Sequence, residues 1–334
     1  MLKLFQSIFG GKEEQGRYPE SLIEMAIERA VDGTYPRLRA MSGYHKRLRE
    51  PVIHAVDHVI GLVDAIARPV PASSAQFASD PRLAALFVSP EHMHEVLGKD
   101  PVLNEYRDQH PEATEGTTAL LLAQRHERNI FGVELQGETV RRDVAQVSVS
   151  FGSHRLLDPN ANEDEARRQL KRRAFDHLLG LALARITEAK GERAGLSQQR
   201  DLLSWKLRVL KKGGWNFEDR PAGHIDALAV QRELDEIESR MEALSVDDRT
   251  LSGQLDVVTD LLSDAEKQLW AEPVELHLDR MNIKRDAQYP DARRISFHEL
   301  HNARGESLAM LFVSLNLREL PQRDKTFANA ERLI

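Results

Sequence analysis

The stretch Ile225–Leu269, IDALAVQRELDEIESRMEALSVDDRTLSGQLDVVTDLLSDAEKQL, decides the fold. Its apolar residues recur with a period near 3.5 over about six heptads, and Asp248 is the one charged residue in the resulting stripe. Such a stripe predicts one long helix packed along a partner helix. The stripe positions are Ala227, Val230, Leu234, Ile237, Met241, Leu244, Asp248, Leu251, Leu255, Val258, Leu262, Ala265 and Leu269.

A partner for this helix precedes it in the chain. The segment from Asn162 to Lys212 has helical periodicity, with acidic residues at its start and lysines at its end, where they suit the helix dipole. Gly213 and Gly214 end it. Two helices of nearly equal length joined by a short connection predict an antiparallel coiled-coil hairpin over residues 161–271.

Strand-like periodicity flanks this hairpin on both sides. Apolar residues alternate with polar ones in three short runs between residues 116 and 160, with turns expected at 126–129 and 136–138. Three more runs follow Pro273, with a turn expected at 302–305. Because a helical hairpin returns the chain to its origin, residues 116–160 and 272–334 are expected to form one small antiparallel β unit.

Residues 1–115 are predicted to be a helical region, so the whole chain is expected to be α+β. Asp80-Pro81, Ser89-Pro90 and Asp100-Pro101 each place proline at the first position of a short helix. A core stripe is expected on the helix before them. It consists of Leu48, Val52, Val56, Val59, Val63 and Ile66.

Composition excludes several classes of function. The chain has no cysteine, which rules out disulfides, zinc–cysteine sites and thiol catalysis and favours the cytoplasm of a bacterial-type cell. The net charge of −7 gives no general attraction to nucleic acid, and none is expected as a partner. No apolar run reaches the roughly 18 residues that a transmembrane helix needs. The motifs of phosphate loops, dinucleotide sites, serine hydrolases and zinc proteases do not occur.

Histidines offer the one hint of chemistry. Those in the β regions are His126, His154, His277, His298 and His301. If their rings converged they could bind a metal ion, and Asp143 or Glu299 could complete a hydrolase or metalloenzyme site. The alternative is scattered surface or core-edge histidines, and no cofactor is expected.

Two further segments carry interaction hypotheses. Trp215 and Phe217, next to Lys211 and Lys212, lie where the two long helices are joined, and exposed aromatic rings beside cations are typical of protein-binding surfaces. The first residues could instead rest at a membrane surface, peripherally at the inner membrane, or pack on the protein itself. Their apolar side chains are Leu2, Leu4, Phe5, Ile8 and Phe9.

The sequence therefore favours a non-catalytic structural or adaptor protein that uses the helical hairpin to bind a protein partner or a second copy. A hydrolase or metalloenzyme with a histidine-rich site is the alternative. A chaperone that holds clients between hairpins is the third hypothesis.

Overall fold

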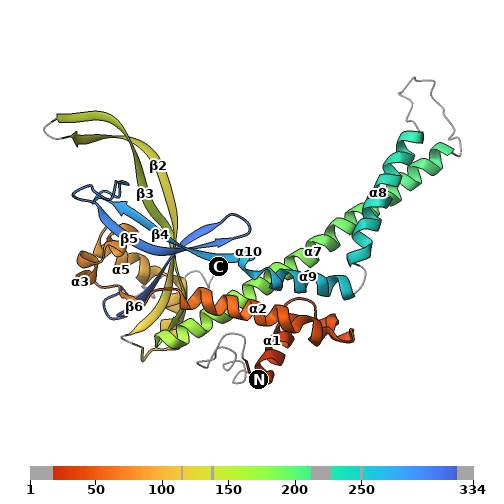
Figure 1. The fold of residues 1–334 in the computed structure, drawn as a ribbon, viewed down its shortest axis with the longest axis horizontal. Helices are drawn as coiled ribbons and strands as arrows, with labels where there is room; N and C mark the ends of the chain where they lie inside the picture. Colours follow the sequence, from red (N-terminus) through yellow and green to blue (C-terminus); the bar gives the residue numbers. More distant parts are fainter. Residues whose placement is uncertain (1–17, 114–115, 137–138, 212–226, 249–250, 322–334) are drawn as a thin grey trace, which may run out of the picture. The chain divides into compact units, whose positions relative to one another are not determined.

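The computed structural model describes residues 18–113, 116–136, 139–211, 227–248 and 251–321 (Figure 1). The fold is α+β, with a sheet whose strand pairings are antiparallel apart from that of β1, as the sequence predicts. The chain divides into two compact units: Met1–Asp57 with Phe175–Ala265, and His58–Ala174 with Glu266–Ile334. This division differs from the four consecutive segments expected from the sequence, because it cuts through two long helices.

The second unit is built on one six-stranded sheet. Its strands are β1 (Val70–Pro71), β2 (Thr117–Gln136), β3 (Thr139–Asn160), β4 (Leu269–Leu278), β5 (Arg293–Asn302) and β6 (Ser307–Leu315). Their order is β3-β2-β6-β5-β4, and β1 pairs in parallel with β6. Since β2 lies beside β6, strands from both sides of the long helices share one sheet, and that prediction is confirmed.

β2 and β3 form an unusually long hairpin. The turn expected at residues 126–129 is wrong, because β2 runs through them as a strand of 20 residues. Three bulges interrupt the pairing, and in each the extra residue lies in β3. Asp143, Ser153 and Asp158 occupy these bulges with positive φ angles of 58°, 52° and 49°. Such bulges increase the local twist, and the β4–β5 connection meets the outer edge of β3 through a bridge between Ser148 and Ile283.

Helices cover both faces of this sheet near its centre. On one face lie four short helices, and on the other the last turns of α2 (Tyr44–Asp64) pack with the first turns of α7 (Glu163–Lys211). The short helices are α3 (Ser74–Ser79), α4 (Pro81–Leu86), α5 (Pro90–Lys99) and α6 (Pro101–Gln109). The predicted proline starts are confirmed, because Asp80, Ser89 and Asp100 each accept a hydrogen bond from a backbone N–H of the first turn.

The first unit is helical. It holds α1 (Glu20–Gly33), η2 (Pro36–Ala40), the first part of α2, most of α7, α8 (Ala227–Asp248) and α9 (Leu251–Ser263). The core stripe predicted for α2 is confirmed, with Leu48, Val52 and Val56 at most 4% exposed. Ion pairs join Arg29 of α1 to Asp176 of α7 and Arg47 of α2 to Asp256 of α9.

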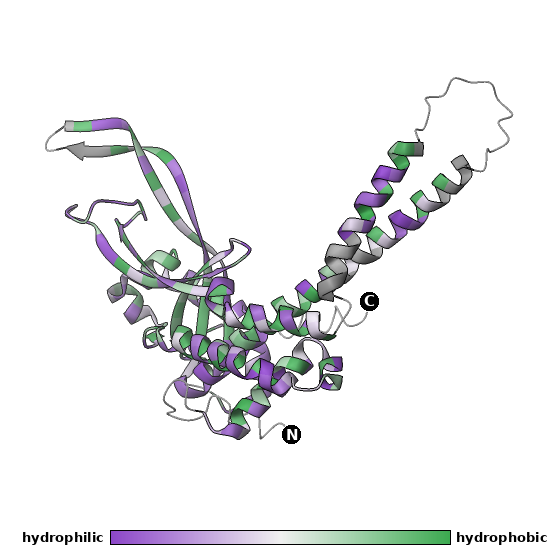
Figure 2. Cartoon of the chain, turned by 45° about the vertical axis from the view of Figure 1, so that its right-hand side comes forward, coloured by the Kyte–Doolittle hydropathy of each residue, from purple (hydrophilic) through white to green (hydrophobic). Residues whose placement is uncertain are grey.

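The predicted single helix over 225–269 is wrong. α8 and α9 run in different directions in Figure 1, the short α10 (Ala265–Gln268) is separate from α9, and Leu269 already belongs to β4. The heptad phase continues across the interruption, which explains why periodicity alone could not reveal it. α7 and α8 lie side by side in Figures 1 and 2, and both carry hydrophobic residues along the pair.

Candidate functional site

The five β-region histidines do not converge. His298 and His301 are three residues apart in β5, and alternate residues of a strand point to opposite faces. His154 lies against α4, where its Nε2 donates to the Leu86 carbonyl oxygen over 2.8 Å. Within the described residues no three His, Asp or Glu side chains are placed to hold a metal ion. The metal-site hypothesis for His126, His154, His277, His298 and His301 is therefore not supported.

One polar cluster does form on the sheet. The Glu299 carboxylate is 2% exposed and accepts two hydrogen bonds from Arg125, over 2.9 and 3.0 Å. These bonds hold the pKa of the Arg125 guanidinium above its ordinary value. The His301 ring stacks on Trp270 with ring centres 5.5 Å apart, and its Nε2 is 3.9 Å from Glu299.

This cluster ties the hairpin to the rest of the sheet. Arg125 is two residues past the last β2 residue that pairs with β6, and Glu299 belongs to β5. Arg125 also bonds to Glu127, so one guanidinium satisfies two carboxylates. This buried, bidentate ion pair fixes the position of the hairpin relative to the rest of the sheet. Both Glu299 oxygen atoms already accept a hydrogen bond from Arg125. Asp143, the other carboxylate considered with the histidines, lies in a bulge of β3.

The predicted tip and membrane residues fall outside the part of the chain that the structure describes. These are Trp215, Phe217 and Lys212 for the tip, and Leu2, Leu4, Phe5, Ile8 and Phe9 for the membrane surface. Lys211 is the final described residue of α7. Both hypotheses therefore remain predictions. No described helix is long and apolar enough to cross a membrane.

The helices that lead to the tip pack through a buried seam. Three residues of α7 and three of α8 form one apolar cluster, each at most 8% exposed. They are spaced by seven and four residues on α7 and by four and three on α8, as expected for a helix pair joined along one stripe. The cluster comprises Leu196, Leu203, Leu207, Val230, Leu234 and Ile237.

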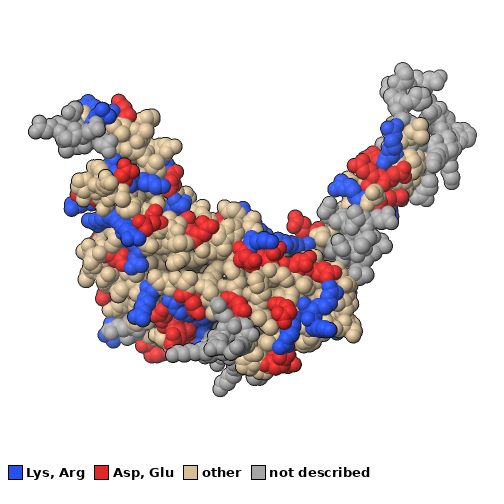
Figure 3. Space-filling model, in the orientation of Figure 1, with Lys and Arg blue, Asp and Glu red and all other residues tan. Residues whose placement is uncertain are grey.

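Apolar residues outside this seam remain exposed. Leu202 of α7 is 64% exposed and Leu228 of α8 is 69% exposed. Leu228 is the second residue of α8 and so lies directly after the connection between the helices. On the face shown in Figure 3, acidic and basic side chains are interspersed along the described part of the pair.

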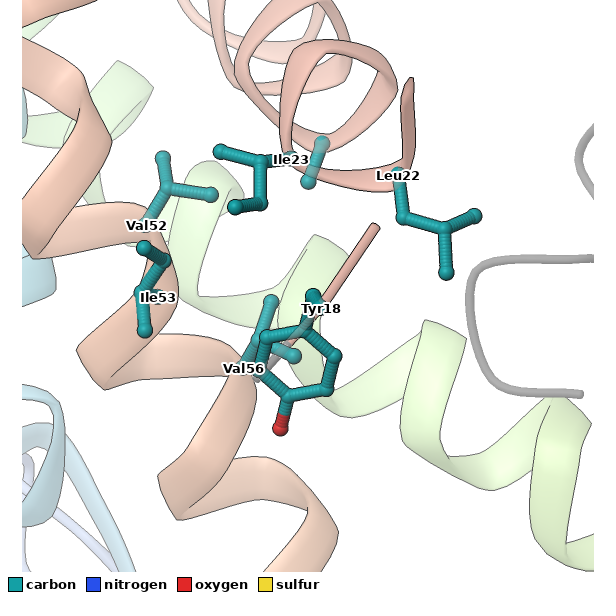
Figure 4. Close-up of a pocket in the computed structure, with 7 residues that line it drawn as sticks. Tyr18, Leu22, Ile23, Val52, Ile53 and Val56 are labelled. Carbon is teal, nitrogen blue, oxygen red and sulfur yellow. The ribbon is translucent and has the colours of Figure 1, made fainter. Parts of the chain in front are cut away.

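A small hollow and an open groove lie in the described part of the helical unit. The first, between α1 and α2, is lined by Tyr18, Ile23, Val52 and other apolar side chains (Figure 4). Its cavity volume of about 10 Å³ is that of about one water molecule. The second is an open groove of about 550 Å³ between η2 and α9. Arg39 at its rim pairs with Glu28 and Asp32.

Comparison with known proteins gives no relative: no protein-family model, no curated protein and no solved structure matches this chain. Its site must therefore be judged on its own geometry.

The structure shows one surface that the sequence did not indicate. Ile130, Phe131, Val133 and Val140 lie on the far part of the β2–β3 hairpin and are 36%, 79%, 60% and 55% exposed. The alternation of Phe131, Val133 and Leu135 predicted a strand with one buried face. The signal that could have corrected this is the polar run Gln124–Asn129, which leaves no apolar neighbour between these residues and the sheet core.

Proposed function

We propose that this chain is a non-catalytic structural or adaptor protein that binds a protein partner through the end of the α7–α8 pair where the helices are joined. The partner is either another protein or a second copy of the chain. The proposal places this work in the cytoplasm, on the basis of the cysteine-free composition.

The closed seam between α7 and α8 is the observation that carries the proposal. Its six apolar residues bury one another, so the pair is stabilised along its length by its own side chains. The exposed residues Leu202 and Leu228 take no part in that seam. Large exposed apolar residues on a self-sufficient scaffold favour a binding role. Trp215 and Phe217 would add aromatic anchors next to them in the chain.

Photo-crosslinking in living cells tests this proposal. A photoreactive amino acid at position 202 or 228 is expected to give a discrete covalent adduct with one partner. The same residue at position 183 is the control, because Leu183 lies on α7 and is 42% exposed but belongs to a different stretch of the helix. Equal labelling from all three positions would show that the exposed leucines mark no specific surface.

The tip residues provide the second half of the test. Trp215→Ala/Phe217→Ala is expected to leave the melting temperature unchanged and to weaken the adduct from position 228 by about 30-fold, the effect of losing roughly 2 kcal/mol of binding. A large loss of stability would instead assign the two rings to the protein's own core. An undiminished adduct would remove them from the binding surface.

A further inference from the structure

The far part of β2 has an open edge. β2 pairs with β6 over Thr117–Ala123, and the register with β3 continues to the pair Gln136–Thr139. In the described residues, the 13 positions from Gln124 to Gln136 pair with β3 alone, so their other edge has no strand beside it. Figure 1 shows this region as a two-stranded ribbon. Backbone N–H and C=O groups along such an edge can pair with another strand.

Apart from charged side chains such as Arg128, the free part of β2 lacks the features that usually protect an edge. Natural edge strands are shortened, bulged or interrupted by proline or lysine. All three bulges of this hairpin lie in β3, and residues 124–136 contain neither proline nor lysine. The outer edge of β3 differs, because it is bulged at Asp143 and bridged at Ser148 by Ile283. β2 is therefore the edge of this ribbon that is suited to receive a strand.

Three of the four exposed apolar residues, Phe131, Val133 and Val140, lie along one face of the same ribbon. Phe131 and Val133 are two residues apart in β2 and so point to the same side. Val140 pairs with residue 135, two positions further on, and shares that side. An isolated two-stranded ribbon is at best marginally stable in water, whereas a four-stranded sheet with an apolar face can be stable. A second two-stranded ribbon paired with this one would complete such a four-stranded sheet.

We propose that the open edge of β2 pairs antiparallel with β2 of a second copy of this chain, about a two-fold axis at Phe131. A two-fold axis perpendicular to the sheet places the same face of both copies on the same side. Side chains alternate between the faces along a strand, and directly opposed residues share a face, so the residue numbers of an opposed pair must add to an even number. Charge complementarity and the length of the overlap together select the register, because a sum of 252 opposes Arg125 and Glu127 but pairs only residues 124–128. Arg128 faces an acidic position within the second β2 only when the residue numbers of each opposed pair add to 262, which places residue 128 opposite residue 134.

In this register Arg128 of each copy faces position 134, a glutamate, of the other copy, and the two Phe131 residues face each other at the axis. Opposite charges and aromatic residues in directly opposed positions both stabilise neighbouring strands. Residues 126–136 of each copy would pair, forming a four-stranded sheet with the apolar face continuous across it. This surface is separate from the one assigned to the α7–α8 pair and adds self-association to the proposed function.

Because the chain has no cysteine, single cysteines can map this pairing directly. Opposed residues in antiparallel strands have Cα atoms about 4.5–5.5 Å apart, within the range of about 4.4–6.8 Å that a disulfide needs. Phe131→Cys in the full chain is therefore expected to form a covalent dimer under mild oxidation. Asn129→Cys and Val133→Cys should each stay monomeric, since four residues of offset separate the two copies of either position by roughly 13 Å.

A mixture of Asn129→Cys and Val133→Cys chains should form the mixed covalent dimer, because 129 and 133 also add to 262. The proposal is overturned if Phe131→Cys crosslinks no faster than Asn129→Cys. It is also overturned if the mixture gives no more dimer than either chain alone. Circular dichroism of each variant should match the parent, since all three positions lie on the exposed ribbon.

Substitutions test the same register without crosslinking. Phe131→Asn is expected to weaken self-association at least tenfold in sedimentation experiments. Val88→Asn is the matched control, because Val88 is 89% exposed and lies outside the sheet. Arg128→Glu should also weaken association, and Arg128→Glu/Glu134→Arg should recover it. A parent chain that stays monomeric at high concentration, or a double variant no better than Arg128→Glu, would overturn the proposal.

Discussion

The α7–α8 pair and the β2–β3 ribbon each consist of two long elements that follow one another in the chain, yet their apolar residues are buried to very different extents. The helices place Leu203, Leu234 and their neighbours inside a seam, each at most 8% exposed. The ribbon leaves Phe131 79% exposed and Val133 60% exposed. One pair completes its own apolar contacts, and the other does not.

The difference follows from the geometry of the two elements. A helix satisfies its backbone hydrogen bonds within itself and needs to hide only one stripe, which a single neighbouring helix can cover. Two strands satisfy half of their backbone groups in each other and still have two faces and two edges. Two long helices can therefore satisfy their backbone hydrogen bonds and bury their apolar stripes without a further element, whereas two long strands need a third element to do both. Substitutions at the base of the ribbon and in the seam can test this contrast.

The largest effect is expected where the ribbon joins the sheet. Arg125→Met would leave the Glu299 carboxylate buried without its cation, and breaking a buried ion pair in this way costs about 3–5 kcal/mol. Arg125 is partly exposed, so the lower end of that range is expected. Urea unfolding followed by circular dichroism would measure the loss.

The surface pair Arg294–Glu275 is the matched control, because it is also an Arg–Glu contact on the sheet but is 69% and 45% exposed. Arg294→Met should cost less than about 1 kcal/mol. If both variants lost the same stability, burial of Glu299 would not be what makes the Arg125 contact important.

A smaller effect is expected in the helical seam. Leu203→Ala should destabilise the α7–α8 pair by about 2 kcal/mol, the lower end of the range for a buried leucine. Its neighbour Leu202 is 64% exposed, and Leu202→Ala should change stability by less than about 0.5 kcal/mol. Hydrogen exchange of residues 196–237 would report the difference locally. Equal protection in both variants would mean that the seam does not stabilise the pair.

Local rules predicted much of this fold. Asp80, Ser89 and Asp100 mark helix starts because a capping oxygen followed by proline suits the first turn. Strand periodicity occurs on both sides of the long helices, and a helical hairpin brings the chain back to where it began. Together these two features predicted one shared sheet. These inferences succeeded because each depends on neighbours in sequence or on simple chain connectivity.

The failures depend on tertiary surroundings. The polar run at 126–129 lies between two alternating apolar runs and was therefore predicted as a turn, but here the strand continues through it beyond the sheet core. α8 and α9 are separate helices that share one heptad phase, so the periodicity of the sequence does not distinguish them from a single helix. The pairing of Arg125 with Glu299 joins residues 174 positions apart, and nothing in either local sequence marks it.

The smallest expected effect concerns His154, which anchors the base of β3 to α4. Burial lowers the pKa of its imidazole, an effect partly offset by the hydrogen bond to the Leu86 carbonyl and increased by nearby His92. The folded protein therefore holds the ring neutral to lower pH than the unfolded chain does, whose ordinary value is about 6.5. As pH falls below that value, the unfolded chain binds the proton first and stability decreases until the lowered folded pKa is passed.

His154→Gln keeps an N–H donor for Leu86 but removes the titrating group. Its unfolding free energy should therefore fall less between pH 7 and pH 5 than that of the parent protein. Chemical unfolding at several pH values would give the difference directly. Parallel pH profiles would mean that His154 titrates alike in both states, and the ring would then be a packing contact with Phe87, on which it stacks at 4.7 Å. A flatter profile for the variant would show that acid destabilises the protein through His154 at the base of the ribbon. The six residues of the helical seam are all apolar and cannot titrate in this way.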